Sequence, residues 1–84
     1  MNVSFTENAW EDYLYWQKTD KKIVKRINEL IKDIKRNPFE GLGKPEPLKY
    51  DLAGKWSRRI TDAHRLVYQV EENNLIVFTC RYHY

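Results

Sequence analysis

The sequence predicts an α+β domain in which two N-terminal helices pack on a small, mainly antiparallel, twisted sheet. The first half carries apolar residues at three- and four-residue spacing, as helices do, and the second half carries alternating apolar residues, as strands do. A segment with two glycines and two prolines separates the halves. Since 84 residues with 42% hydrophobic content hold one core, we expect a single domain over residues 1–84.

A short strand and a helix are expected first. Val3 and Phe5 alternate with polar residues, which predicts a strand. Thr6 can then cap a helix, because its hydroxyl can accept a hydrogen bond from a backbone N–H of the first turn. This helix should run to about Gln17.

The second helix has the strongest pattern. Thr19 or Asp20 can cap it, and Asn37-Pro38 should end it, because proline disfavours helical backbone in the residue before it. Its apolar positions are Ile23, Val24, Ile27, Leu30, Ile31 and Ile34. Its other face carries Lys21, Lys22, Lys25, Arg26, Lys32, Lys35 and Arg36. That basic face indicates either a solvated surface or a contact with RNA or the ribosome, and the sequence leaves both open.

The segment from Phe39 to Lys49 is predicted to be a stiff loop. Its glycines and prolines disfavour regular structure. Glu46 lies between Pro45 and Pro47, so its backbone has little freedom and its carboxylate is held outward. Glu46 is therefore either part of a rigid connector or a candidate site residue.

Three strands should follow, near residues 56–61, 65–70 and 75–82, and form a meander. The apolar alternation sets the register, because a one-residue slip would reverse the two faces of a strand. We expect Ile60 opposite Leu66. We also expect the apolar face against the helices to pair Leu66, Tyr68 and Val70 with Cys80, Phe78 and Ile76.

The opposite face of the sheet should then be cationic. Period-two alternation places on it Arg59, Arg65, Arg81 and His83. Like charges on adjacent strands repel, so the cluster indicates a phosphate ligand, which the guanidinium fork fits well. The alternative is that the arginines pair with Asp62, Glu71 or Glu72. His64, in a turn, is expected to be structural or solvated.

Composition excludes several classes of protein. The single cysteine, Cys80, excludes an internal disulfide framework and fits a reducing cytoplasm. No stretch reaches the roughly 20 apolar residues of a membrane span, and the opening residues lack a signal-peptide pattern. Two histidines without a carboxylate cluster favour neither zinc nor magnesium. We therefore expect a cytoplasmic protein without a cofactor, whose net charge of +3 weakly suggests a polyanionic partner.

RNA offers chemistry that needs no metal. Its 2′-hydroxyl can attack the adjacent phosphorus if a base takes the hydroxyl proton, cations stabilise the phosphoryl oxygens and an acid protonates the leaving 5′-oxygen. Glu46, the arginines and His83 could supply these parts. A non-catalytic RNA- or ribosome-binding module is the alternative, although it would gain nothing from a carboxylate facing phosphate. A third hypothesis is a protein-interaction domain whose arginines receive an acidic partner.

Six runs of the sequence resemble the YoeB family of toxins, within the RelE superfamily. They are Asp12 to Gln17, Ile27 to Asp33, Gly43 to Lys49, Trp56 to Thr61, His64 to Tyr68 and Cys80 to Tyr84. The Lys-Pro-Glu-Pro-Leu-Lys loop and the Arg-Tyr-His-Tyr end are specific in combination, whereas the helix patterns would suit many folds. The resemblance implies a microbial-RNase-like fold and a ribosome-dependent mRNA endoribonuclease, neutralised by a YefM-type antitoxin.

The resemblance also implies roles for individual residues. Glu46 corresponds to the general base, His83 to the general acid and Arg65 to the phosphate stabiliser. The supporting residues correspond to Lys49, Arg59 and Tyr84. Arg81 is placed by the register argument alone, as a phosphate contact or a partner of the C-terminal carboxylate. The expected partners are the antitoxin, the ribosome and mRNA, with a homodimer as a further expectation.

Overall fold

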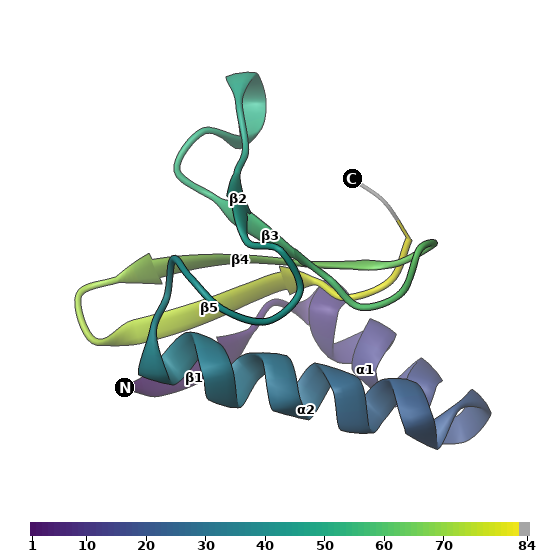
Figure 1. The fold of residues 1–84 in the computed structure, drawn as a ribbon. Helices are drawn as coiled ribbons and strands as arrows, with labels where there is room; N and C mark the ends of the chain where they lie inside the picture. The colour runs from purple at the N-terminus through teal and green to yellow at the C-terminus, as the bar shows by residue number, and fades with distance from the viewer. Residues whose placement is uncertain (83–84) are drawn as a thin grey trace.

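Two helices cover one face of a five-stranded sheet in the computed structural model, which describes residues 1–82 (Figure 1). The elements are β1 (Asn2–Phe5), α1 (Glu7–Thr19), α2 (Lys21–Arg36), β2 (Glu46–Pro47), the 3₁₀ helix η1 (Tyr50–Leu52), β3 (Trp56–Arg59), β4 (Arg65–Glu71) and β5 (Asn74–Thr79). The predicted α+β class is confirmed. Neither α1 nor α2 is long and apolar enough to cross a membrane.

Both helices begin at the predicted capping residues. The Thr6 hydroxyl accepts a hydrogen bond from the Ala9 N–H at 3.1 Å, and the Asp20 carboxylate accepts one from the Lys22 N–H at 3.0 Å. α1 extends two residues beyond Gln17, because Asp20 both ends α1 and caps α2. The Asp20 N–H donates to the Trp16 carbonyl at 2.8 Å, so the two helices meet with no intervening loop.

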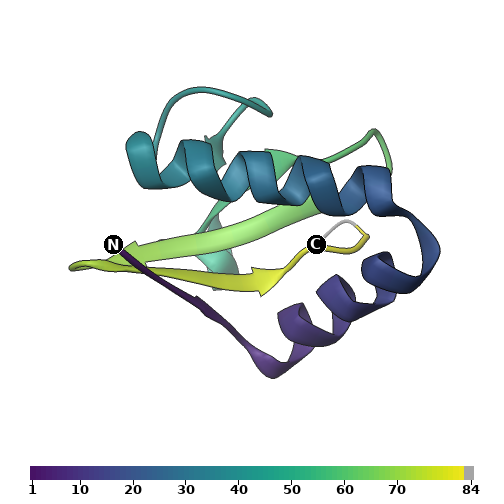
Figure 2. The ribbon, with the colours of Figure 1, turned by 90° about the horizontal axis from the view of Figure 1, so that it is seen from below.

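The sheet has the strand order β1-β5-β4-β3-β2. Strands β3, β4 and β5 form the predicted antiparallel meander, and α1 and α2 lie together on one side of it (Figure 2). Two pairings were not predicted. β1 runs parallel to β5, and β2 arises within the segment predicted to be a loop. β2 can contain Pro47 because it lies at the edge of the sheet, where a missing N–H removes no ladder hydrogen bond.

The register between β3 and β4 differs by two residues from the expected one. Leu66 lies opposite Arg58 rather than Ile60. The reason is that the turn begins earlier than expected: the Ile60 N–H donates a hydrogen bond of 2.9 Å to the His64 carbonyl, so only residues 61–63 lie between these two positions. A shift of two residues leaves every side chain on its predicted face, so Arg59 and Arg65 still share the face opposite the helices.

The register between β4 and β5 also differs from the expected one. A bulge at Val67 and Tyr68 places Tyr68 opposite Val77, and Val70 opposite Leu75. Leu75 and Val77 are consequently the buried residues of β5, whereas the predicted core residues Ile76 and Phe78 are only half-buried. The helix side of the sheet is closed as expected by Leu66, Tyr68 and Cys80, packed against Ile27, Leu30 and Ile34 of α2.

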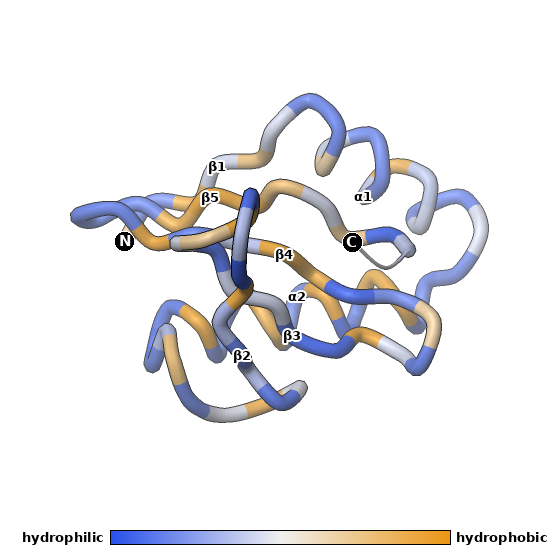
Figure 3. The backbone as a smooth tube through the Cα atoms, turned by 90° about the horizontal axis from the view of Figure 1, so that it is seen from above, coloured by the Kyte–Doolittle hydropathy of each residue, from blue (hydrophilic) through white to orange (hydrophobic). Residues whose placement is uncertain are grey.

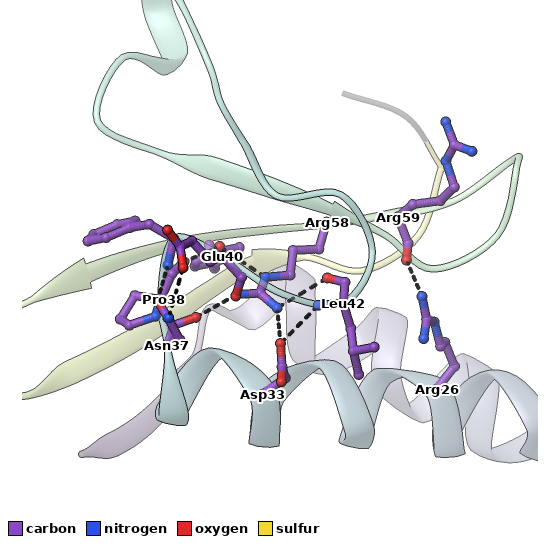
Figure 4. A network of polar contacts seen from close by, with 10 residues as sticks. Arg26, Asp33, Asn37, Pro38, Glu40, Leu42, Arg58 and Arg59 are labelled. Carbon is purple, nitrogen blue, oxygen red and sulfur yellow. Dashed lines mark hydrogen bonds and ion pairs between the residues drawn. The ribbon is translucent and has the colours of Figure 1, made fainter.

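A fully buried arginine fixes the segment between α2 and β2. Arg58, on the helix side of β3, donates five hydrogen bonds (Figure 4). They reach Asp33 Oδ2 at 2.6 Å, the carbonyls of Leu42, Asn37 and Glu40 at 3.1, 2.7 and 2.9 Å, and the Tyr68 hydroxyl at 3.2 Å. Tyr68 in turn donates to the Pro38 carbonyl at 2.6 Å. The loop therefore wraps around a guanidinium with all its donors used.

Two glycines allow this close wrapping. Gly41 has φ 121°, and a Cβ there would overlap the Asp33 carboxylate. Gly43 has φ 77°, and a Cβ there would lie 2.9 Å from the Arg59 carbonyl oxygen. The Gly43 carbonyl accepts a hydrogen bond from the Arg59 N–H at 2.6 Å. The loop is thus joined to β3 just before β2 begins, which sets the position of Glu46.

We expect Asp33→Ala to lower the free energy of unfolding by about 3 kcal/mol or more, because it leaves the buried Arg58 cation without its counter-ion. Glu29→Ala is the matched control, since Glu29 is exposed one turn earlier on α2. It should change the unfolding free energy by less than about 0.5 kcal/mol. Chemical denaturation at pH 7 measures the unfolding free energy of both variants. Equal losses in the two variants would show that the Arg58–Asp33 ion pair does not contribute to stability.

The same pair gives stability a pH dependence. A hydrogen bond from the Leu42 N–H and the Arg58 guanidinium hold the pKa of Asp33 below its ordinary value of 3.8. A lowered folded-state pKa gives a contribution that is complete above the unfolded-state pKa and is lost as the pH falls through the folded-state pKa. The difference in unfolding free energy between the wild type and Asp33→Ala should therefore be full at pH 7 and shrink below about pH 4. A difference that stays constant to pH 2 would contradict this.

Candidate active site

An acidic and a basic side chain meet across β3 on the sheet face opposite the helices. Glu46 Oε1, on β2, lies 3.5 Å from Arg65 Nη1, on β4, and β3 lies between these strands. The Arg65 side chain is 16% exposed and that of Glu46 is 56% exposed. The structure thus brings together an accessible carboxylate and a guanidinium that packing holds in place.

Arg59 adds a second cation to this face. It lies directly opposite Arg65 in the β3–β4 ladder, where like charges destabilise the pair. Its contact with Asp62 is 3.8 Å long and involves a fully exposed carboxylate, so it contributes little. The alternative, pairing of the arginines with acidic neighbours, is therefore present at Asp62 but weak. Figure 3 shows the hydrophilic segments at the end of β3 and the start of β4 side by side.

Lys49 lies between β2 and η1. This segment belongs to the hairpin between β2 and β3, which projects from the side of the sheet away from the helices (Figure 1). Lys49 is exposed and precedes η1, three residues after Glu46. The next residue, Tyr50, is 92% exposed and has a positive φ of 57°, although the sequence patterns did not single it out. The hairpin tip thus extends the cationic face with a lysine and a solvent-facing ring.

Arg81 does not lie where the register argument placed it. β5 ends at Thr79, so strand alternation does not reach this residue. The Arg81 guanidinium carbon lies 3.5 Å from the centroid of the Tyr15 ring on α1 and 4.5 Å from that of Tyr82. Its observed partners are therefore aromatic rings, one of them on the helix layer.

The chain is anchored firmly just before its last two residues. The Tyr82 N–H donates to His64 Nδ1 at 2.7 Å, and the Tyr82 carbonyl accepts from the Arg65 N–H at 3.1 Å. The Cys80 carbonyl accepts from the Trp16 indole at 2.9 Å. His64 is thus structural, as expected. His83 and Tyr84, the predicted acid and a supporting residue, lie outside the described residues.

Arg58 is a residue that the sequence reasoning missed. The signal was available, since the alternation that directs Arg59 outward directs Arg58 into the core beside Trp56 and Ile60. A buried arginine needs a counter-ion, and the sequence alone does not identify Asp33 among the acidic residues.

Cys80 is not a nucleophile in this fold. It is fully buried, and burial together with the charge of Asp12 raises the pKa of its thiol to about 12. Residues 1–82 contain no group of three or more His, Cys, Asp or Glu side chains that could hold a metal ion. The chemistry that the described side chains offer on the cationic face is proton acceptance by Glu46 and anion binding by Arg59 and Arg65.

Comparisons with known proteins relate the sequence and the fold of this chain to one family. The family described as "YoeB-like toxin of bacterial type II toxin-antitoxin system" matches residues 5–84. Toxin YoeB of Escherichia coli K12 is 64% identical over the full length of both chains. Among solved structures, a YoeB dimer from Staphylococcus aureus has 54% sequence identity to this chain and a TM-score of 0.94. A YoeB-YefM complex from the same organism has 53% sequence identity and a TM-score of 0.93. Each alignment covers 100% of this chain and 98% of the solved one.

Proposed function

The chain belongs to the YoeB-like toxins of bacterial type II toxin-antitoxin systems, and we propose that it is a ribosome-dependent endoribonuclease. It cuts messenger RNA in the ribosomal A site and so inhibits translation. The observation that supports this most directly is the Glu46 carboxylate held 3.5 Å from Arg65, with Arg59 opposite. A proton acceptor beside two phosphate-binding cations is what attack by a ribose 2′-hydroxyl requires.

The proposed reaction starts with phosphate binding. A phosphodiester bound by Arg59 and Arg65 relieves the repulsion between these two directly opposed cations. Arg65 must then leave Glu46, which costs little, because the contact is long and Glu46 is more than half exposed. Binding of the substrate thus frees the base at the moment when it is needed.

The bond changes follow from that geometry. Glu46 takes the proton of the 2′-hydroxyl, whose oxygen attacks phosphorus while the bond to the 5′-oxygen breaks. Arg65 and Arg59 stabilise the negative charge that accumulates on the phosphoryl oxygens. His83 donates a proton to the leaving 5′-oxygen, and the products are a 2′,3′-cyclic phosphate and a 5′-hydroxyl. Lys49 and Tyr84 bind the flanking RNA, and no metal takes part.

The ribosome completes the site by holding the messenger in line for attack. The free protein offers an open sheet face with Glu46 engaged by Arg65, which supports the need for an external scaffold. A YefM-type antitoxin binds and neutralises the protein, which also forms a homodimer. In support, the similar S. aureus structures are named as a YoeB-YefM complex and a YoeB dimer. Its proposed location is the cytoplasm.

Purified protein should cleave messenger on programmed ribosomes and leave free messenger largely intact. The upstream fragment should end in a 2′,3′-cyclic phosphate or 3′-phosphate, because the 2′-oxygen is the nucleophile. Cleavage should persist at EDTA concentrations that leave ribosomes intact. Mass spectrometry of the fragment ends decides: a 3′-hydroxyl with a 5′-phosphate would contradict the mechanism, and ribosome binding without cleavage would favour a non-catalytic binding module.

Arg65→Ala should lower the single-turnover rate at saturating ribosome concentration by roughly 10²-fold or more, because charge accumulates on the phosphoryl oxygens only as attack proceeds. Ribosome affinity should change little. Lys18→Ala, which removes an exposed cation from the end of α1, is the control and should retain the wild-type rate. Loss of ribosome binding with an unchanged saturated rate would make Arg65 a docking residue instead.

A further inference from the structure

Ser57 lies on β3, between the strands that carry Glu46 and Arg65. The register pairs it with Glu46 on β2 and with Val67 on β4, and directly opposed residues share one face of a sheet. Ser57 is therefore on the outer face with Glu46. Because β3 separates β2 from β4, the contact between Arg65 and Glu46 spans β3, the strand on which Ser57 is paired with Glu46.

The Ser57 hydroxyl is fully buried and has no hydrogen-bond partner among the described residues. Such groups are rare in folded proteins, because burial without a partner is unfavourable. It is the one buried side-chain polar atom in the described part of the chain that lacks a partner. Ser57 is the register partner of Glu46, the proposed base. An unpartnered hydroxyl at this position indicates that it gains a hydrogen-bond partner when substrate occupies the site.

Glu46 is the acceptor that the fold offers to this hydroxyl. Val67, on the other side of Ser57, is apolar. Arg65 has only donors, so it can give a hydrogen bond to the hydroxyl oxygen but cannot receive the hydroxyl proton. The Glu46 carboxylate has one oxygen 3.5 Å from Arg65, a length at the limit for a hydrogen bond, and both oxygens can accept.

We infer that Ser57 is a positioning residue for Glu46, an inference that rests on the proposed function. When phosphate draws Arg65 away, Glu46 loses the contact that holds it in the free protein. The Ser57 hydroxyl then donates to one Glu46 oxygen and fixes the carboxylate, and the other oxygen faces the 2′-hydroxyl. Ser57 keeps its proton throughout, so it contributes geometry and no proton transfer.

A crystal structure of Arg65→Ala tests the geometry without any assay of activity. Removing the guanidinium imitates its departure toward phosphate, and Ser57 Oγ should then lie about 2.7 Å from a Glu46 oxygen. A Ser57 hydroxyl that stays unpartnered, or that binds another group, would overturn the inference. This readout stands even if the protein proves not to cleave RNA.

Ser57→Ala supplies the functional test in the wild-type protein. Its melting temperature should be equal to or above that of the wild type, because the substitution removes an unsatisfied buried hydroxyl. The saturated single-turnover rate should nevertheless fall about 10-fold or more, since Glu46 loses its fixed position. Ser57→Thr keeps the hydroxyl and should restore most of the rate.

A double substitution separates action through Glu46 from action on the substrate. In a Glu46→Gln background, where the base is already absent, adding Ser57→Ala should change the rate by less than about twofold. A further 10-fold loss would show that Ser57 acts independently of Glu46 and would overturn the inference. So would a wild-type rate in Ser57→Ala. Absence of cleavage by the wild type itself would instead refute the proposed function.

Discussion

The buried guanidinium of Arg58 is the constraint on which the rest of this structure depends. A cation in the core is tolerated only if its charge is paired and its hydrogen-bond donors are satisfied. Here Asp33 of α2 pairs the charge, and the loop carbonyls accept hydrogen bonds from the guanidinium. The loop after α2 therefore has one acceptable path, around the guanidinium. Because Arg58 is on β3 and Asp33 is on α2, the same contact also fixes the helix layer against β3, the strand next to the edge strand β2.

The path of this loop also sets the position of the proposed active-site residues. After its contacts with the guanidinium, the loop reaches Gly43, whose carbonyl accepts a hydrogen bond from the Arg59 N–H. It continues into β2, which begins at Glu46. Adjacent residues of β3 thus have opposite tasks: Arg58 faces the core and holds the loop, while Arg59 faces outward toward the proposed phosphate site. A strand needs only its two-residue alternation to separate a structural from a functional arginine.

The sequence was sufficient for what local physics determines. It predicted the helices, the Thr6 and Asp20 caps and the outward face of Arg59 and Arg65, because capping chemistry and apolar spacing act over a few residues. It did not predict the parallel pairing of β1, the edge strand β2 or the bulge at Val67, which depend on contacts between distant segments. The Arg58–Asp33 pair was missed for the same reason, since its two residues lie on different elements. The unpartnered Ser57 hydroxyl was missed because its burial depends on how distant segments pack. His83 and Tyr84 rest on the resemblance of their motif alone.

The central claim is that Glu46 accepts the 2′-hydroxyl proton while His83 donates one to the leaving 5′-oxygen. Each proton transfer is worth roughly 10² to 10⁴ in rate, so Glu46→Gln and His83→Gln should each slow cleavage by about that factor. Sulfur in place of the scissile 5′-oxygen departs without an acid and separates the two roles. The most direct measurement is therefore single-turnover cleavage of a 5′-thio messenger on programmed ribosomes. This substrate should largely restore the cleavage rate of His83→Gln and leave that of Glu46→Gln low. Restoration of Glu46→Gln alone would reverse the two roles, and restoration of neither would contradict proton transfer by both residues.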